Sequence, residues 1–170
     1  MSLSDFVIRQ ERQRDAAAVA RLSASAFGPG RFARSAYRVR EGADASSTLD
    51  QLKLCAWRGE QLVGSLHFTP ILVGGASGAL LLGPLAIAPD RMGQGWGCQL
   101  LEEGLKRAEA AGYRLVVLVG DLSYYGRLDF VVSPSGRIIL PGPVDPARLL
   151  VKELVSGALA EYWGDVRYAN

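Results

Sequence analysis

Residues 81–112 read LLGPLAIAPDRMGQGWGCQLLEEGLKRAEAAG, and the rest of the chain is interpreted outward from this stretch. The almost wholly apolar segment 80–87 is typical of a strand that is covered on both faces. A long helix is predicted to follow the glycines, with an apolar face made of Leu101, Leu105 and Ala108. The stretch therefore predicts a buried strand, a glycine loop and an amphipathic helix in succession.

The glycine loop carries the chemistry that can be argued from residues alone. Gly93, Gly95 and Gly97 alternate with Gln94 and Trp96. Glycines remove the side chains that keep a ligand away from the backbone, and the N–H groups of a helix start attract phosphate or diphosphate. A tight strand-to-helix turn without a ligand remains the alternative.

Two nucleotide-binding motifs fit the loop poorly. It has no Gly-Lys-Ser/Thr sequence, which argues against a P-loop. Its spacing is GxGxG rather than GxGxxG, and Asp121 is poorly placed to bind a ribose. A protein that binds NAD or ATP through the same loop stays a third-ranked hypothesis.

Composition indicates one globular domain over residues 1–170. Hydrophobic residues make up 49% of the chain and charged residues 21%, which excludes a disordered chain. The net charge of +2 gives no reason to expect a nucleic-acid partner. No apolar run approaches the roughly 20 residues of a membrane span, so no membrane partner is expected either.

Cysteine and histidine usage argues against a metal site. Cys55 and Cys98 are far apart, and neither has a second ligand at metal spacing. We expect two free thiols in a reducing compartment, no metal cofactor and a cytoplasmic location. The first residues, MSLSDFVIRQER, do not resemble a signal peptide.

Periodicity and turn residues predict the remaining elements. Strands are expected at 5–10, 52–57, 62–73, 114–119, 130–133 and 149–155, and helices at 15–27, 31–40 and 122–128. Asp15 is expected to cap the first helix, and Gly74, Gly75 and Gly78 to turn the chain into the central strand. The tail 163–170 is expected to pack back. The strand–helix–strand unit around the loop predicts two parallel neighbouring strands.

The loop resembles the coenzyme A loop of the GCN5-related N-acetyltransferase (GNAT) superfamily. Ile87-Ala88-Pro89 resembles the family's strand end, and Gly95 and Gly97 its paired small residues. Met92 stands where the family usually has Gln or Arg. The segments LGPLAIAPD, VVLVGDLSYYGRLDF and GDVRY are similar to the YhbS-like acetyltransferases. Asp129 replaces the family's glycine before Phe130, and Asp tolerates a positive φ better than most residues.

The resemblance implies an α/β (α+β) fold and a cofactor site. The fold would be a mixed, mostly antiparallel sheet of six to seven strands, splayed between strands four and five and flanked by about four helices. The backbone at Leu85, Ala86 and Ile87 would pair with the pantetheine arm, and one N–H there would face the thioester oxygen. The diphosphate would lie on a run of seven residues: Met92, Gly93, Gln94, Gly95, Trp96, Gly97 and Cys98.

The resemblance also implies a catalytic residue. Tyr125 has the family's spacing from Phe130 and would protonate the departing thiolate, whereas Tyr124 is expected to pack. The general base stays open between His67, Asp121 and water. The acceptor is expected near four residues of the second predicted helix, either as ligands or as plain surface: Arg31, Arg34, Tyr37 and Arg38.

The sequence thus predicts an enzyme that transfers an acetyl group from acetyl-CoA to an amine by direct attack on the thioester. The acceptor is a small molecule or a peptide, and the protein is a monomer or a homodimer. A non-catalytic module that binds acyl-CoA is the alternative.

Overall fold

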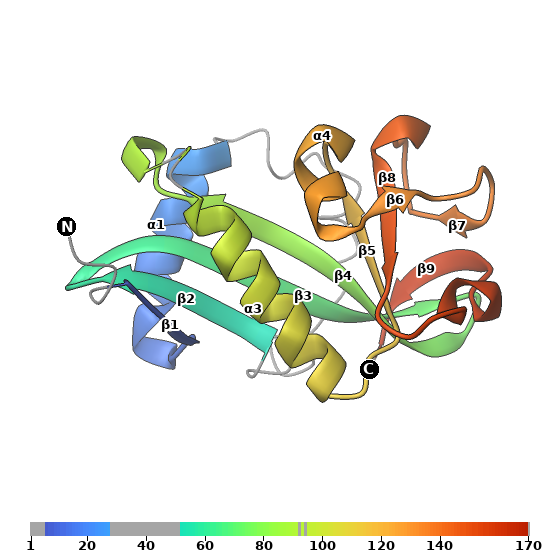
Figure 1. The fold of residues 1–170 in the computed structure, drawn as a ribbon, viewed down its shortest axis with the longest axis horizontal. Coiled ribbons are helices and arrows are strands. Elements are labelled where there is room, and N and C mark those ends of the chain that lie inside the picture. Colours follow the sequence, from blue (N-terminus) through green and yellow to red (C-terminus); the bar gives the residue numbers. More distant parts are fainter. Residues whose placement is uncertain (1–5, 28–51, 92, 94, 170) are drawn as a thin grey trace.

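The computed structural model describes residues 6–27, 52–91, 93 and 95–169 (Figure 1). Within these residues nine strands and three α-helices are arranged in an α+β fold. The strands are β1 Phe6–Gln10, β2 Lys53–Arg58, β3 Gln61–Val73, β4 Ala76–Ile87, β5 Leu115–Val119, β6 Val131–Val132, β7 Ile138–Ile139, β8 Leu149–Glu153 and β9 Gly164–Tyr168. The helices are α1 Ala16–Phe27, α3 Trp96–Ala110 and α4 Leu122–Tyr125, with short 3₁₀ turns η2 Gln13–Asp15 and η6 Gly126–Leu128.

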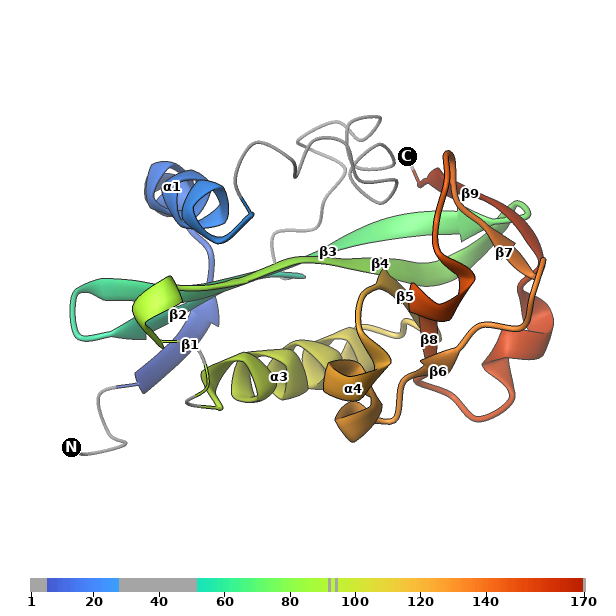
Figure 2. The same ribbon diagram turned by 90° about the horizontal axis from the view of Figure 1, so that it is seen from above.

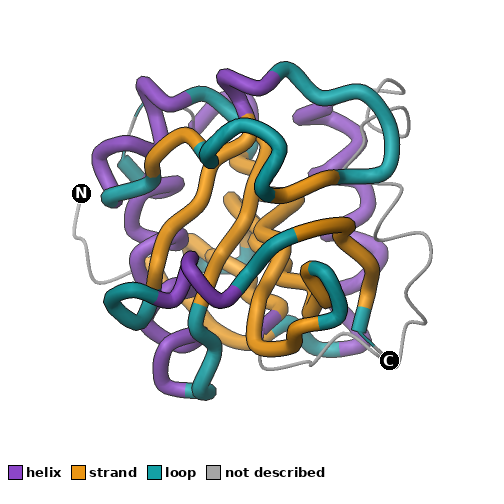
Figure 3. Tube along the Cα trace, turned by 90° about the vertical axis from the view of Figure 1, so that its right-hand side faces the viewer, coloured by secondary structure: helices purple, strands orange, loops and turns teal. Residues whose placement is uncertain are grey.

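Seven strands form the main path of the sheet, in the order β1-β2-β3-β4-β5-β8-β6. The β4–β5 pair is parallel, as predicted, and its neighbours on this path are antiparallel. Helix α1 covers one face, and α3 and α4 lie on the other (Figure 2). Seen from the β7–β9 end, helical segments flank the strands on both sides (Figure 3). The predicted mixed sheet between helical layers is confirmed.

Helix α3 packs the face that its sequence pattern predicts. Leu101, Leu105 and Ala108 are buried, and Gly104 lets the helix approach β3 closely. A Cβ at Gly104 would lie 2.6 Å from Leu66 Cδ2 and 2.8 Å from Phe68 Cε2. The helix is therefore held firmly against β3, and this contact fixes the position of its first turn beside the end of β4.

The predicted splay lies between β4 and β5. The two strands pair from Ala79↔Leu115 to Leu81↔Val117, whereas β4 continues to Ile87. On the other side, the β3 partners of Leu82 and Leu85 are Phe68 and Leu66, so β4 holds one extra residue there. Such a bulge bends a strand and increases its twist. The bend turns the second half of β4 away from β5.

Three predictions about the N-terminal half need correction or stay open. Asp15 does not cap α1, because it belongs to the preceding η2 turn and its carboxylate accepts from the Arg12 N–H (2.8 Å). Gly78 was expected in the turn but lies inside β4. There its missing side chain makes room for the Tyr162 hydroxyl. The predicted helix 31–40 lies outside the described residues.

At the C-terminal end, β8 is not the last strand. The tail predicted to pack back forms β9, which pairs with β3 from Ile71↔Tyr168 to Val73↔Val166. Strand β3 is long enough for two partners on this edge, since its pairing with β2 ends at Lys53↔His67. No helix in the described part of the chain is long and apolar enough to cross a membrane.

Candidate functional site

One edge of β4 faces the splay, and beyond Leu81 no described strand pairs with its backbone groups. The Ala88 N–H donates to the Val63 carbonyl (2.9 Å), so residue pair 63/88 is hydrogen-bonded. Because antiparallel pairs alternate, Ala86 also turns its backbone groups toward β3, while Leu85 and Ile87 turn theirs to the opposite edge. The pairing of that edge with β5 ends at Leu81. An extended ligand can therefore pair with Leu85 and Ile87 in the manner of an added strand.

The start of α3 is open beside this edge. Gly95, the N-cap, and Gly93 both have φ +80°, and a Cβ at either would have no described atom within 4 Å. The first turn of α3 carries no acidic residue, and no side chain of the described residues caps it. Its N–H groups and the positive end of the helix dipole are thus available to an anion. Met92 and Gln94 lie outside the described residues.

Trp96 anchors the helix start rather than lining it with its ring. The indole is 8% exposed, stacks on Phe6 with centroids 5.4 Å apart, and lies 5.4 Å beneath the Arg58 guanidinium. The Trp96 ring therefore belongs to the core rather than to the proposed ligand site. The ring instead ties the first turn of α3 to the outer strands β1 and β2.

Gly97 and Cys98 bring the start of α3 against α4. A Cβ at Gly97 would collide with the Tyr124 hydroxyl and lie 3.4 Å from Ile87 Cγ1. Burial, more than the neighbouring Cys98 thiol, raises the pKa of Tyr124 above its usual value. Tyr124 therefore bridges two helices as well as packing. The sequence alone gave no sign of this bridge, because it depends on the missing side chain at Gly97.

Tyr125 is held between the end of β5 and Phe130. Its half-buried ring meets Phe130 edge-to-face at 5.7 Å and Tyr124 at 4.9 Å. A Cβ at Gly120 would lie 2.5 Å from Tyr125 Cε2. Asp129 adopts φ +67°, so the turn expected from the resemblance forms with Asp in the glycine position. These contacts place Tyr125 at the carboxyl end of β5, on the α3 side of the splay.

The two side chains considered as a base have different surroundings. Asp121 occupies the N-cap position of α4, yet its carboxylate caps no N–H of that helix. The Asp121 side chain is 71% exposed and pairs with Arg148 at 3.3 Å. His67 lies on β3, and its Nε2 is 2.5 Å from Glu11 Oε2. The four residues predicted to contact the acceptor lie outside the described residues: Arg31, Arg34, Tyr37 and Arg38.

Both cysteines are free thiols. Burial, aided by the carboxylates of Glu11 and Asp15, raises the pKa of Cys55 to about 12, which makes this thiol unreactive near neutral pH. Among the described residues, no three His, Cys, Asp or Glu side chains gather closely enough to hold a metal ion.

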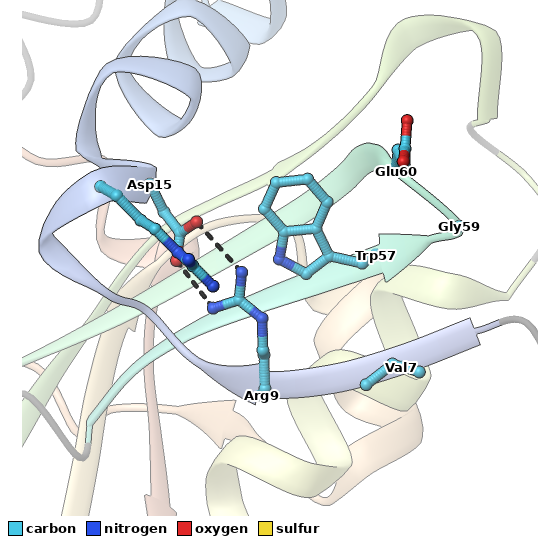
Figure 4. A pocket seen from close by; sticks show the side chains of 7 residues that line it. Val7, Arg9, Asp15, Trp57, Gly59 and Glu60 are labelled. Carbon is cyan, nitrogen blue, oxygen red and sulfur yellow. Dashed lines mark hydrogen bonds and ion pairs between the residues drawn. The ribbon is translucent and has the colours of Figure 1, made fainter.

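A separate open pocket lies at the outer edge of the sheet, away from the splay (Figure 4). Its walls come from β1, β2, the turn that joins β2 to β3, and η2. Arg9 donates two hydrogen bonds to Asp15 (2.7 and 3.0 Å) and lies 5.0 Å from the Trp57 ring. The ion pair holds this corner of the fold together.

Known proteins share both the sequence pattern and the fold. The model of the acetyltransferase (GNAT) family matches residues 17–130. The uncharacterized N-acetyltransferase YhbS of Escherichia coli (strain K12) is 31% identical over 109 residues. These residues are 64% of this chain and 65% of YhbS, so the chain spans slightly less than two thirds of that relative. The uncharacterized N-acetyltransferase YjhQ of the same strain is 28% identical over 76% of this chain and 72% of its own.

Two solved structures extend the similarity. The crystal structure of E. coli YhbS in complex with CoA matches with a TM-score of 0.82 and 29% identity, covering 97% of this chain and 90% of that one. A GNAT family acetyltransferase from Brucella melitensis in complex with acetyl-CoA matches with a TM-score of 0.66 and 33% identity, covering 86% and 95%. The family model matches more than half of this chain, and the splayed β4–β5 pair is in place. The chain therefore belongs to the acetyltransferase (GNAT) family.

Proposed function

We propose that this protein is a cytoplasmic, single-domain enzyme that transfers the acetyl group of acetyl-CoA to an amine acceptor. One observation carries the proposal: the outward backbone groups of Leu85 and Ile87 adjoin the open N-terminus of α3. A long ligand with an amide-containing arm and a diphosphate matches this pair of features. The two related structures hold CoA and acetyl-CoA.

The binding residues act through their backbones. The N–H groups at the start of α3, from Gly93 to Cys98, bind the diphosphate, and the open edge of β4 aligns the pantetheine arm. An N–H at Leu85 or Ile87 then faces the thioester oxygen and stabilises the negative charge that develops during attack. Met92 and Gln94 belong to the same proposed loop.

Tyr125 assists the departure of the thiolate. The amine nitrogen attacks the thioester carbon directly, the C–N bond forms, and the C–S bond breaks. The Tyr125 hydroxyl gives its proton to the sulfur and recovers one from the amide nitrogen through water. The packing of its ring against Phe130 and Gly120 keeps the hydroxyl from rotating away.

The test measures acetyl-CoA binding by calorimetry and CoA release with a panel of small amines, peptide N-termini and lysine peptides. We expect Tyr125→Phe to lower kcat about 100-fold without changing the Kd of acetyl-CoA. Tyr124→Phe removes the neighbouring hydroxyl and is the matched control, for which kcat should change little.

Other outcomes overturn specific parts of the proposal. Equal kcat values for Tyr125→Phe and wild type would remove the acid role from Tyr125. Tight CoA binding with no acceptor consumed would favour a non-catalytic acyl-CoA-binding module. Preference for NAD or ATP over CoA in competition would overturn the choice of ligand.

A further inference from the structure

A row of polar side chains lies on the α1 face of β3. Leu66 and Phe68 point to α3, as their contacts with Gly104 show, so the alternate residues Ser65, His67 and Thr69 point to the other face. Ser65 and Thr69 are 1% and 4% exposed. A buried sheet face under a helix is normally apolar, so this polar row needs a reason beyond packing.

His67 in this row is paired with a carboxylate. Its Nε2 lies 2.5 Å from Glu11 Oε2, and the His67 and Glu11 side chains are 23% and 10% exposed. Glu11 is itself anchored, because its N–H donates to the Lys53 carbonyl (2.7 Å), and Lys53 is the register partner of His67. A carboxylate on Nε2 keeps the proton there and leaves the Nδ1 lone pair available as a base. No described residue hydrogen-bonds to Nδ1.

The pair lies one strand away from the splay. Leu66 and Phe68, on either side of His67, pair with Leu85 and Leu82, so His67 faces the bulge of β4. Strand β4, about 5 Å away, separates His67 from the splay, and the His67 Nε2 is turned to Glu11 on the β2 side, so water on the α1 face has to carry the proton between the acceptor and the imidazole. Tyr125 packs in the α3-side core, so His67 and Tyr125 lie on opposite faces of the sheet.

We propose that the Glu11–His67 pair receives the acceptor amine on the α1 face of the sheet, with His67 Nδ1 as its proton acceptor. The proposal rests on the acetyl transfer proposed above and names the base for it. The acceptor is a cationic amine, since an aliphatic amine is protonated near neutral pH and must lose a proton before it can attack the thioester. Glu11 is a positioning residue that selects the tautomer of His67.

The proton balance is complete. His67 Nδ1 takes one proton from the ammonium group and later releases it to water. The free amine forms the C–N bond while the C–S bond breaks, and its second proton replaces the one that Tyr125 delivers to sulfur. The products are the acetylated amine, CoA thiol and one released proton.

Few other titratable groups face this site within the described residues. The β1–β2 side contributes Arg9, Glu11, Lys53 and Cys55, the η2 turn contributes Asp15, which is paired with Arg9, and α1 contributes the exposed Arg21. Strand β4 has no titratable side chain. The Cys55 thiol stays protonated, because burial raises its pKa to about 12. A pH effect on amine transfer is assigned to the pair only where it is lost in His67→Gln and changed in Glu11→Gln.

The test follows kcat/KM for a responsive amine against pH in wild type, His67→Gln and Glu11→Gln, with the Kd of acetyl-CoA measured in parallel. The wild-type rate should fall at low pH, since only a neutral imidazole can accept a proton from the amine. We expect His67→Gln to lose about 100-fold in kcat/KM together with this acid limb, and added imidazole to restore part of the rate in His67→Ala. Glu11→Gln should lower the rate about tenfold and change the acid limb.

Cys55→Ala is the control, as it alters a buried residue of the adjacent strand and should leave the profile unchanged. An unaltered pH profile in His67→Gln, with only a lower melting temperature, would show that the pair is structural and overturn this proposal alone. Should His67→Gln fail to fold, an unchanged profile in Glu11→Gln has the same force. A wild-type protein that binds acetyl-CoA but transfers to no amine would overturn the acetyl transfer and this proposal together.

Discussion

At the scale of single residues, the charge on Asp15 is stabilised by two donors. The side chain is 4% exposed, yet it accepts from the Arg9 guanidinium and from the Arg12 N–H. The bond from Arg9, followed by that from Arg12, lowers the pKa of Asp15 to about 2 in spite of its burial. A carboxyl group with a lowered pKa stabilises the fold above its unfolded value and loses that contribution as pH falls through its folded value.

Asp15→Asn should therefore be less stable than wild type by about 2 kcal/mol at pH 7, the free energy that corresponds to the pKa shift. The difference should shrink as pH falls from about 4 to about 2, because wild-type Asp15 is protonated in that range. Urea unfolding of both proteins across this range measures it. Asp121→Asn, which breaks the exposed pair with Arg148, should cost less than about 1 kcal/mol. A stability gap that is equal at pH 7 and pH 2 would contradict the prediction.

At the scale of elements, α3 links the core to the proposed ligand site. One face of the helix is fixed by Leu101, Leu105 and Ala108, and the Glu103–Arg107 pair (2.9 Å) forms on the solvent side as the i,i+4 spacing predicts. Both ends of the helix have a glycine with a positive φ. Gly95 at the start and Gly112 just past the end have φ +80° and +90°, and neither has a described atom near an added Cβ.

These two glycines provide a matched test of the helix start. Alanine at either position should cost about 1 kcal/mol through backbone strain, measured by urea unfolding. Only Gly95→Ala should also weaken CoA binding, by about tenfold in calorimetry, because its methyl group occupies the space beside the first N–H groups of α3. Equal CoA affinity in Gly95→Ala and Gly112→Ala would argue against a diphosphate at this helix start.

At the scale of the whole molecule, the C-terminal strand β9 packs against the tight turn that joins β3 to β4. Gly74 donates to the Asp165 carbonyl (2.9 Å) and lies against the backbone of Trp163. Gly75, the next residue, has a positive φ as well but no described atom within 4 Å of an added Cβ. The two glycines share a turn but differ in whether β9 packs on them.

Gly74→Ala should therefore destabilise the protein by about 3 kcal/mol, since a Cβ there collides with the Trp163 carbonyl. Gly75→Ala should cost about 1 kcal/mol from strain alone. Urea unfolding compares the two, and amide exchange should show faster exchange in β9 for Gly74→Ala only. If both variants unfold at the same urea concentration, β9 does not depend on this turn.

Local patterns predicted most of the central unit. The apolar run of β4, the glycines and the 3.6-residue periodicity of α3 each act within a few residues, so the strand, the loop, the helix and the parallel β5 are as expected. The turn through Asp129 was also predicted, since it depends on the conformational tolerance of one residue. The role of Tyr125 stays a prediction from resemblance.

Contacts between distant segments were not predictable in this way. Strand β9 pairs with a part of β3 that lies beyond the end of β2. The approach of the Tyr124 hydroxyl to Gly97 requires α3 and α4 to lie side by side.

The sequence by itself determined the elements around the glycine loop, because helix and strand periodicity and positive-φ glycines are local properties of the chain. The tertiary structure alone decided which edge of β4 is open and which side chains meet there. Glu11 and His67 are 56 residues apart, and they meet because the order of strands brings β1, β2 and β3 side by side. That order follows from the packing of the whole sheet, which no short stretch encodes.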